Sequence, residues 1–289
     1  MANGIIIIDK PEEWTSMDVC AKLRGILKER RIGHGGTLDP MATGVLPVFV
    51  GNATKAVEFA EKGDKEYIAG LRLGLVTNTQ DTTGEILSES ATIPDRAALE
   101  AVLPRFTGPI AQIPPMFSAI KRDGKKLYEL ARAGKEVHRE PRPITIYSLE
   151  VLEQAGERDY LLRIRCSKGT YIRTLCHDIG AALGCGGCMY SLRRTMAAGF
   201  TLSEAVKLEQ VMEEKEALLL PTDSFFRRYE AYILPSPRQE KLCRNGNPIP
   251  VRDLAEGQLY RVYSQEGDFL CLSRQTGGQL ISVKNFFGG

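Results

Sequence analysis

One stretch of fifteen residues sets the expectations for the rest of this chain, and it reads Gly33-His34-Gly35-Gly36-Thr37-Leu38-Asp39-Pro40-Met41-Ala42-Thr43-Gly44-Val45-Leu46-Pro47. It contains four glycines and two prolines. Glycine adopts backbone angles that other residues avoid, whereas proline fixes its own φ and lacks an N–H donor. The composition therefore predicts a shaped loop that is neither a regular helix nor a central strand. The apolar run over residues 45–50 predicts a buried strand at its end.

One carboxylate, Asp39, stands in this loop directly before Pro40. Proline disfavours the α region for the residue before it, which pushes Asp39 toward an extended conformation. Gly35, Gly36 and Gly44 leave room for a flat ligand or another backbone to approach. An aspartate before proline in such a loop is commonly a turn residue. The local chemistry therefore leaves two interpretations open, a turn and a catalytic carboxylate.

The composition is that of an ordinary globular protein, with 43% hydrophobic and 26% charged residues in a chain of 289. This length suits one large domain, or a large domain with a small one. We expect no membrane span, because no apolar run approaches the ~18 residues that a transmembrane helix needs. The short apolar run at residues 5–8 predicts a buried strand and not a signal peptide, so the expected location is cytoplasmic.

The seven cysteines predict no disulfide framework, because they are scattered and odd in number. Cys185 and Cys188 form a C-x-x-C pair, but no second pair with zinc-site spacing accompanies it. We therefore expect reduced thiols and no metal. The chain also lacks a Walker loop or a dinucleotide fingerprint, and we expect no cofactor.

The net charge is only +2, but basic residues gather between positions 121 and 142, where eight basic and four acidic residues give a local charge of +4. Such clustering is typical of a surface that contacts nucleic acid, although a solvated helix face looks similar. Prolines on both sides predict an insertion over about 114–143 that leaves the core. The basic residues are Lys121, Arg122, Lys125, Lys126, Arg132, Lys135, Arg139 and Arg142.

The remaining pattern predicts an alternation of helices and strands. Thr15 and Asp18 form a capping-box sequence for a helix that ends near residue 31. The alternation from Lys65 to Leu75 predicts a strand with Tyr67 on its apolar face. Further helices are expected at 54–62, 95–103, 170–183 and 201–220, strands at 144–152 and 159–166, and a polar turn at 77–84. Beyond Pro235 and Pro237, runs at 259–263, 269–272 and 280–283 predict a small β unit docked on the main domain.

Four blocks of this sequence together resemble the TruB family of pseudouridine synthases. They are the stretch from His34 to Pro47, Lys65-Glu66-Tyr67, Gly169-Thr170-Tyr171-Ile172-Arg173 and Leu192-Arg193-Arg194-Thr195. The blocks follow the family's order over roughly the first 200 residues. The resemblance implies an α+β chain with a pseudouridine synthase fold over residues 1–232, in which helices flank a mixed, mainly antiparallel sheet. It also implies a small C-terminal β-rich PUA-like domain over residues 233–289, which would bind RNA.

The resemblance further implies an isomerase that converts uridine 55 in the T-loop of tRNA to pseudouridine after flipping the base out of its stack. Such an enzyme binds the T stem-loop and needs no cofactor, metal or obligatory protein partner. We expect it to act as a monomer, and the sequence leaves an additional RNA-folding activity open.

The family motifs assign roles to individual residues of this chain. Asp39 would attack C1′, abstract the 2′-proton to give a glycal, or add to C6, and Arg173 would pair with it. Tyr67 would stack on one face of the uracil and Leu192 would contact the other, while His34 would occupy the space that the flipped uridine leaves. Taken singly, Tyr67 and Leu192 also fit core residues and Arg173 an exposed helical arginine. The residues implied to contact phosphates are Lys65, Lys168, Arg193, Arg194 and the basic residues of the insertion.

Two alternatives remain from the sequence. A guide-RNA-dependent relative shares the chemistry but works inside a ribonucleoprotein; the absence of long basic termini disfavours it. A non-catalytic RNA-binding or RNA-folding protein would use the Asp39 loop only structurally, so Asp39→Asn would leave its function unchanged. A retaining glycosidase is disfavoured because no partner acid stands in a matching motif.

Overall fold

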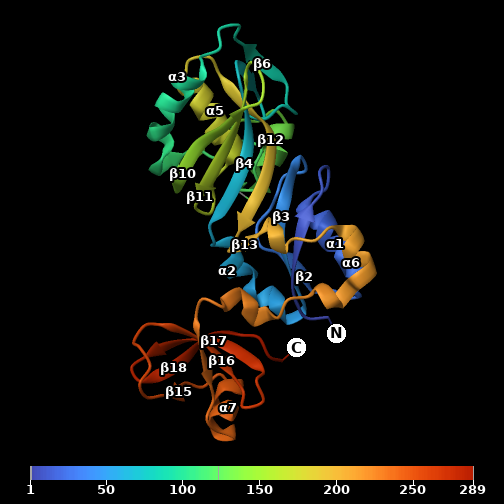
Figure 1. The fold of residues 1–289 in the computed structure, drawn as a ribbon, viewed down its shortest axis with the longest axis vertical. Coiled ribbons are helices and arrows are strands. Elements are labelled where there is room, and N and C mark those ends of the chain that lie inside the picture. Colours follow the sequence, from blue (N-terminus) through green and yellow to red (C-terminus); the bar gives the residue numbers. More distant parts are fainter. Residues whose placement is uncertain (1, 123, 289) are drawn as a thin grey trace.

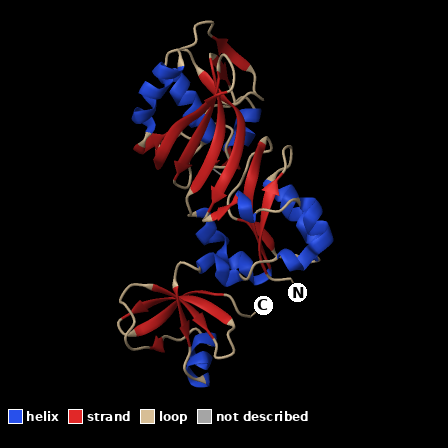
Figure 2. Cartoon of the chain, viewed as in Figure 1, coloured by secondary structure: helices blue, strands red, loops and turns tan. Residues whose placement is uncertain are grey.

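The computed structural model describes residues 2–122 and 124–288 of the chain. They form an elongated molecule with a large body on a long twisted sheet and a smaller C-terminal body at one end (Figure 1). Strands run through the middle of the large body and helices lie on its flanks (Figure 2).

The large body is built on a nine-stranded sheet in which, among the described strands, only β3 and β12 pair in parallel. The main path runs β1-β3-β12-β4-β11-β10-β7, with β2 beside β3 and β13 beside β12. The strands are β1 Gly4–Lys10, β2 Ile32–His34, β3 Ala42–Val50, β4 Lys65–Leu73, β7 Gly108–Gln112, β10 Arg142–Gln154, β11 Asp159–Cys166, β12 Gly187–Ala197 and β13 Phe200–Thr201. This arrangement confirms the predicted α+β fold with a mixed, mainly antiparallel sheet.

Two helices cover the two halves of this sheet. Helix α1, Ser16–Leu27, begins at the predicted capping box, in which the Asp18 amide donates to Thr15 Oγ1 at 3.1 Å and the Thr15 amide to Asp18 Oδ2 at 2.9 Å. Its apolar face packs on β1 and β3. Helix α5, Ile172–Ala182, packs with the alternating buried residues of β4, β11 and β12.

Shorter elements complete the large body. The helices are α2 Val57–Glu61, α3 Arg96–Val102, α4 Leu127–Arg132 and α6 Leu208–Glu214. The hairpins are β5 Leu75–Thr77 with β6 Ile86–Glu89, and β8 Lys121–Arg122 with β9 Lys125–Lys126. The 3₁₀ helices are Gly51–Ala56, Leu103–Phe106, Leu202–Glu204, Lys215–Leu218 and Thr222–Phe226. Within the described ranges, no helix combines the length and the apolar character that a membrane span requires.

The expectation that residues 33–47 would hold no central strand is wrong. Strand β3 starts at Ala42 and lies between β1 and β12. Gly44 has a φ of 100°, and an added Cβ would overlap the backbone of β12, so glycine here permits the close approach of two strands. Pro47 falls between residues 42–44, which pair with β12, and residues 48–50, which pair with β2. Proline is tolerated at such an interruption in the pairing.

Two predicted helices also differ from the structure. Helix α5 begins after Thr170, whose hydroxyl donates to the carbonyl oxygen of Ser167 at 2.9 Å instead of capping the helix. The helix expected over 201–220 is divided into a 3₁₀ turn, α6 and a second 3₁₀ turn. The division arises because Val206 pairs with β1, donating to the Ile7 carbonyl at 2.8 Å and accepting from the Asp9 amide at 2.9 Å.

The C-terminal body is a five-stranded sheet in the order β14-β16-β17-β18-β15, with one helix, α7. Its elements are β14 Glu230–Ile233, α7 Pro237–Arg244, β15 Ile249–Pro250, β16 Leu259–Tyr263, β17 Phe269–Thr276 and β18 Gln279–Asn285. Strand β14 spans the expected boundary at residue 232 and pairs in parallel with β16. Phe226, Phe269 and Phe286 join the two bodies in one apolar cluster, and Lys284 reaches Glu58 at 2.6 Å.

Candidate active site

A cavity of about 470 Å³ opens where the loop before β3 meets β4, β12 and the start of α5. Its lining includes four residues that the sequence singled out for the chemistry or the base, Asp39, Tyr67, Arg173 and Leu192. Lys65 also lines it. Four separate segments of the chain therefore converge on one space, which is large enough for a small organic ligand.

The backbone on both sides of Asp39 is held by fixed hydrogen bonds. Ser16 Oγ accepts from the Leu38 amide at 2.8 Å and donates to the Leu38 carbonyl at 3.2 Å. The fully buried ammonium of Lys10 donates to the Pro40 carbonyl at 3.2 Å. Burial lowers the pKa of Lys10 to about 8. The backbone of the loop is thus fixed by Ser16 and Lys10, while the side chain of Asp39 remains 42% exposed at the cavity.

Arg173 joins Asp39 to a second, buried carboxylate. Its Nε lies 3.1 Å from Asp39 Oδ2, and its Nη1 lies 3.4 Å from Asp81 Oδ2. The guanidinium also donates to the carbonyl oxygens of Thr79 at 3.2 Å and Phe117 at 3.0 Å. Because the side chains of Arg173 and Asp81 are only 9% and 6% exposed, this charge is fixed in place and presented to Asp39.

The start of helix α5 is held by a side chain from strand β7. Gln112, at the end of β7, accepts from the Tyr171 amide at 2.8 Å and donates to the Tyr171 carbonyl at 3.0 Å. Tyr171 is the N-cap residue of α5, and its own side chain does not cap the helix. The two hydrogen bonds with Gln112 hold the backbone of this residue instead. These bonds fix the first turn of α5, and with it the direction of Arg173.

Tyr67 and Leu192 provide the apolar part of the cavity lining. Both are 8% exposed, and they come from β4 and β12, which are paired strands. Burial raises the pKa of the Tyr67 hydroxyl, which hydrogen-bonds to the guanidinium of Arg194. The ring and the leucine side chain can contact a flat base without reading its identity.

Arg194 is a structural residue, and the expectation of a phosphate contact there is wrong. Its side chain is 1% exposed, and its guanidinium donates to the carbonyl oxygens of Val45 at 2.7 Å, Gly36 at 3.1 Å and Thr37 at 3.4 Å. It therefore ties the Asp39 loop to the beginning of β3 and to β12.

The other cations expected to contact phosphates have different surroundings. Lys65 is 7% exposed, and its ammonium donates to the carbonyls of Glu61 at 2.7 Å and Gly63 at 2.6 Å. Burial lowers the pKa of Lys65 to about 8. The side chain of Arg193 lies on the opposite face of β12 from the cavity, where it pairs with Asp9 at 2.9 Å. Lys168 is exposed beside the cavity lining residue Gly169.

His34 ends β2 and pairs with Val48, outside the cavity lining. Its Nδ1 is buried and has no hydrogen-bond partner among the described residues. Burial lowers the pKa of His34, and the nearby positive charge of Arg194 lowers it further.

The insertion covers one side of the cavity with Phe117, Ser118 and Tyr128. Lys126 Nζ lies 5.4 Å from the centre of the Tyr128 ring and the Arg132 guanidinium carbon 5.5 Å from it. Lys125, Arg132, Lys135 and Arg142 are exposed. Arg139 donates to the Pro114 carbonyl at 3.3 Å and pairs with Glu136 at 2.9 Å. The side chains of Lys121 and Arg122 lie outside the described part of the structure.

Sequence reasoning missed Asp81 as a site residue, because residues 77–84 resemble an ordinary polar turn. Its carboxylate accepts from the Thr79 hydroxyl at 2.7 Å and from the Thr83 hydroxyl at 2.6 Å. Threonines two residues before and after an aspartate are a local signal for such a fixed carboxylate. As for metals, no three His, Cys, Asp or Glu side chains of residues 2–122 and 124–288 are grouped to hold an ion, and Cys185 and Cys188 are buried thiols.

Comparisons with known proteins give the class of this site. The model of the TruB family pseudouridylate synthase N-terminal domain matches residues 24–172, and that of the tRNA pseudouridylate synthase B C-terminal domain matches residues 173–227. A solved chain from a Cbf5–Nop10–Gar1 complex is similar to this one with a TM-score of 0.76 at 27% identity, over 99% of this chain and 85% of that one. The fold and the site define a pseudouridylate synthase, which is an isomerase.

Curated relatives narrow the class to a family. The tRNA pseudouridine synthase B of Pseudomonas putida is 50% identical over 93% of this chain and 90% of its own length. That of Cupriavidus metallidurans is 42% identical over 96% of this chain and 92% of its own length. The chain belongs to the TruB family of pseudouridylate synthases, as its sequence motifs predicted.

Proposed function

We propose that this protein converts uridine 55 in the T-loop of tRNA to pseudouridine, with Asp39 as the reacting carboxylate. The observation that carries this proposal is the half-exposed Asp39 carboxylate, held 3.1 Å from Arg173 Nε beside Tyr67 and Leu192. The names of the relatives support tRNA as the substrate. The position of the uridine comes from the resemblance of the sequence blocks to the family motifs.

The reaction breaks the N1–C1′ bond, turns the uracil and joins C5 to C1′, and the hydrogen on C5 is finally released. Because a base within a stem-loop is stacked, it must flip into the cavity, where Tyr67 and Leu192 would hold its faces. Asp39 would act in its ionised form by attack on C1′, by abstraction of the 2′-proton to give a glycal, or by addition to C6. Arg173 would pair with the carboxylate and hold it in a fixed direction in the cavity.

Release of tritium from tRNA labelled at C5 of uridine tests this proposal, because C5 loses its hydrogen only when it becomes the glycosidic carbon. We expect wild-type protein to release tritium from the T-loop and Asp39→Asn to release none while still binding tRNA. Asp95→Asn is the matched control: asparagine caps a helix as well as aspartate does, and Asp95 caps α3 away from the cavity. Full activity of Asp39→Asn would refute the role of the carboxylate.

We also propose that the enzyme acts as a cytoplasmic monomer on free tRNA, with phosphate contacts from Lys168 and the exposed cations of the insertion, and with the C-terminal sheet as a PUA-like RNA-binding module. A guided mode is the alternative, since the solved Cbf5 chain belongs to a complex with two other proteins. Purified chain with an unmodified tRNA transcript separates the two. Turnover without added protein or guide RNA supports the stand-alone enzyme, and turnover only after their addition supports the guided one.

A further inference from the structure

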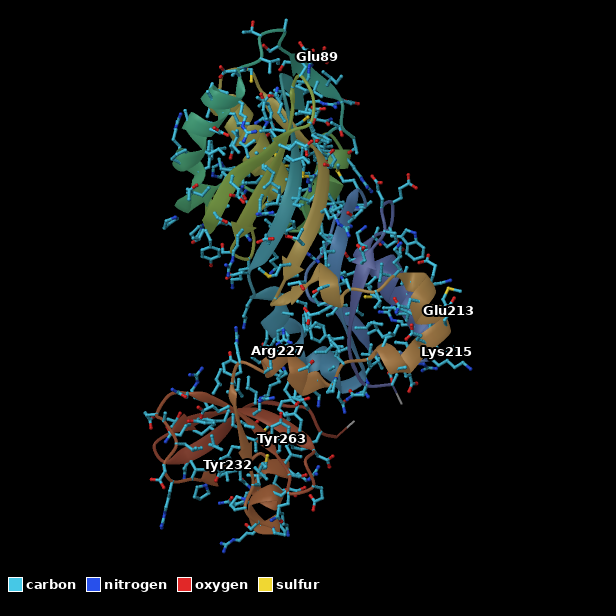
Figure 3. The ribbon with its side chains drawn as sticks, in the orientation of Figure 1. Glu89, Glu213, Lys215, Arg227, Tyr232 and Tyr263 are labelled. Carbon is cyan, nitrogen blue, oxygen red and sulfur yellow. The ribbon has the colours of Figure 1, made fainter. Side chains whose placement is uncertain are left out.

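A second cavity, of about 270 Å³, lies near the junction of the two bodies and is separate from the one that holds Asp39. It is lined by the turn after α2, the end of β11, the turn between β12 and β13, and the 3₁₀ helix Thr222–Phe226 with the residues after it. Arg227 lies at this junction (Figure 3). Arg165, Arg227 and Arg228 contribute to its lining, and we call this cavity the arginine pocket.

The charges of the arginine pocket are poorly neutralised by the protein. Among the described residues, neither Arg165 nor Arg228 has a carboxylate oxygen within 4.0 Å, and Arg227 lies 3.7 Å from Glu204 while remaining 66% exposed. The one acidic residue in the lining, Asp64, already accepts from the Tyr147 hydroxyl at 3.1 Å. The pocket therefore presents a net positive charge to whatever enters it.

The walls of the pocket favour an anion with several acceptor oxygens. Phe59, Phe200 and Phe225 form an apolar lining, which strengthens charge–charge attraction by excluding water. The buried Ser224 Oγ has no hydrogen-bond partner among the described residues and is available as a donor. Guanidinium groups match the oxygens of a phosphate in paired hydrogen bonds.

The position of the pocket relates it to the RNA substrate. Asp64 directly precedes Lys65, and Arg165 stands two residues before Ser167, and both of these neighbours line the Asp39 cavity. Lys65 and Cys166 pair at one end of β4 and β11, so the two cavities lie at the same end of these strands. Because side chains alternate along a strand, Arg165 and Met196, which pair with Glu66, face away from Lys65 and Tyr67 in the Asp39 cavity. The backbone of a polynucleotide with one base in the Asp39 cavity would pass the ends of β4 and β11 to enter the arginine pocket. We propose that the arginine pocket binds a backbone phosphate of the RNA substrate, a conclusion that rests on the proposed function.

The test is the salt dependence of tRNA affinity, measured by fluorescence anisotropy of a labelled transcript between 50 and 300 mM KCl. For the double variant Arg165→Gln, Arg228→Gln we expect about tenfold weaker binding and a slope of log affinity against log salt that is shallower by about 1–2. Replacing the same two arginines by lysine keeps the charge and should restore most of the slope. Arg163→Gln is the matched control, because Arg163 lies on the same strand and is paired with Glu150 at 3.1 Å; it should leave both quantities unchanged.

An unchanged affinity and salt slope in the double variant would overturn the proposal. The same holds if inorganic phosphate, compared with chloride at equal ionic strength, raises the melting temperature of the wild type but not of the variant while tRNA binding is unaltered. That result would assign the pocket to free phosphate. Failure of the proposed function is a separate result: wild-type protein would release no tritium from tRNA, whatever the salt slopes.

Discussion

Arg194 and Arg193 are neighbours in β12 whose side chains lie in opposite environments, and replacing each by methionine tests how the Asp39 loop is held. Arg194→Met removes three hydrogen bonds from a buried guanidinium to loop and strand carbonyls, and also its bond with the Tyr67 hydroxyl. Each lost bond to a charged donor costs about 1.5–3 kcal/mol, and the desolvation of the guanidinium, no longer required, offsets part of the sum. We expect the free energy of unfolding to fall by about 3–5 kcal/mol.

Arg193→Met is the matched control. The side chains of Arg193 and Asp9 are 41% and 24% exposed, so the loss of this partly solvated pair should cost about 1 kcal/mol. Urea unfolding followed by the fluorescence of the single tryptophan, Trp14, measures both values; its carbonyl accepts from Lys10, which also holds the Asp39 loop. Equal losses in the two variants would refute the assignment of Arg194 as the residue that holds the loop.

Three further predictions follow from the same contacts. Gly44→Ala should lower the free energy of unfolding by at least ~3 kcal/mol because the added Cβ would overlap β12, whereas Gly246→Ala, with an open Cβ position, should cost about 1 kcal/mol; similar costs in urea unfolding would contradict this. Asp81→Asn should slow single-turnover tritium release about 10–100-fold without weakening tRNA binding, because Arg173 loses a charged partner; a wild-type rate would exclude that positioning role. In the folded protein the pKa of Lys65 is about 8, whereas the ordinary lysine side chain has a pKa of 10.5. Below pH 8, Lys65 is therefore charged in both the folded and the unfolded chain. Above pH 8, the unfolded chain binds more protons than the folded one. The stability of the wild type relative to Lys65→Met should therefore rise by about 2 kcal/mol from pH 8 to 10, and a difference that stays constant would contradict the lowered pKa.

Local patterns predicted those elements that their own residues specify. The capping box of Thr15 and Asp18 fixes the start of α1 by contacts across three residues, and the alternation in β4 places Tyr67 on the buried face. The helix expected over 201–220 failed for the opposite reason. Val206, near its start, pairs with β1 almost two hundred residues earlier, and no local propensity predicts that contact.

In the candidate site, too, the features set by local sequence were predicted and those set by distant contacts were not. Asp39 stood out because glycine and proline make its loop unusual, but the buried carboxylate of Asp81 did not, since its charged partner, Arg173, is 92 residues away. Arg193 and Arg194 could not be told apart from composition. Strand parity turns one toward solvent and the other toward the loop, and parity depends on the register of β12 against β3 and β4.

The parallel pairing of β12 with β3 has a consequence for the order of events during synthesis. The Asp39 loop leaves the ribosome before Arg194, which ties it down and follows Val45 by 149 residues. At typical elongation rates of about 5–20 residues per second, Arg194 is translated roughly 7–30 s after the loop. A nascent chain stalled before β12 should therefore carry the Asp39 loop untethered, and the reactive carboxylate gains its fixed geometry only when nearly the whole large body has emerged.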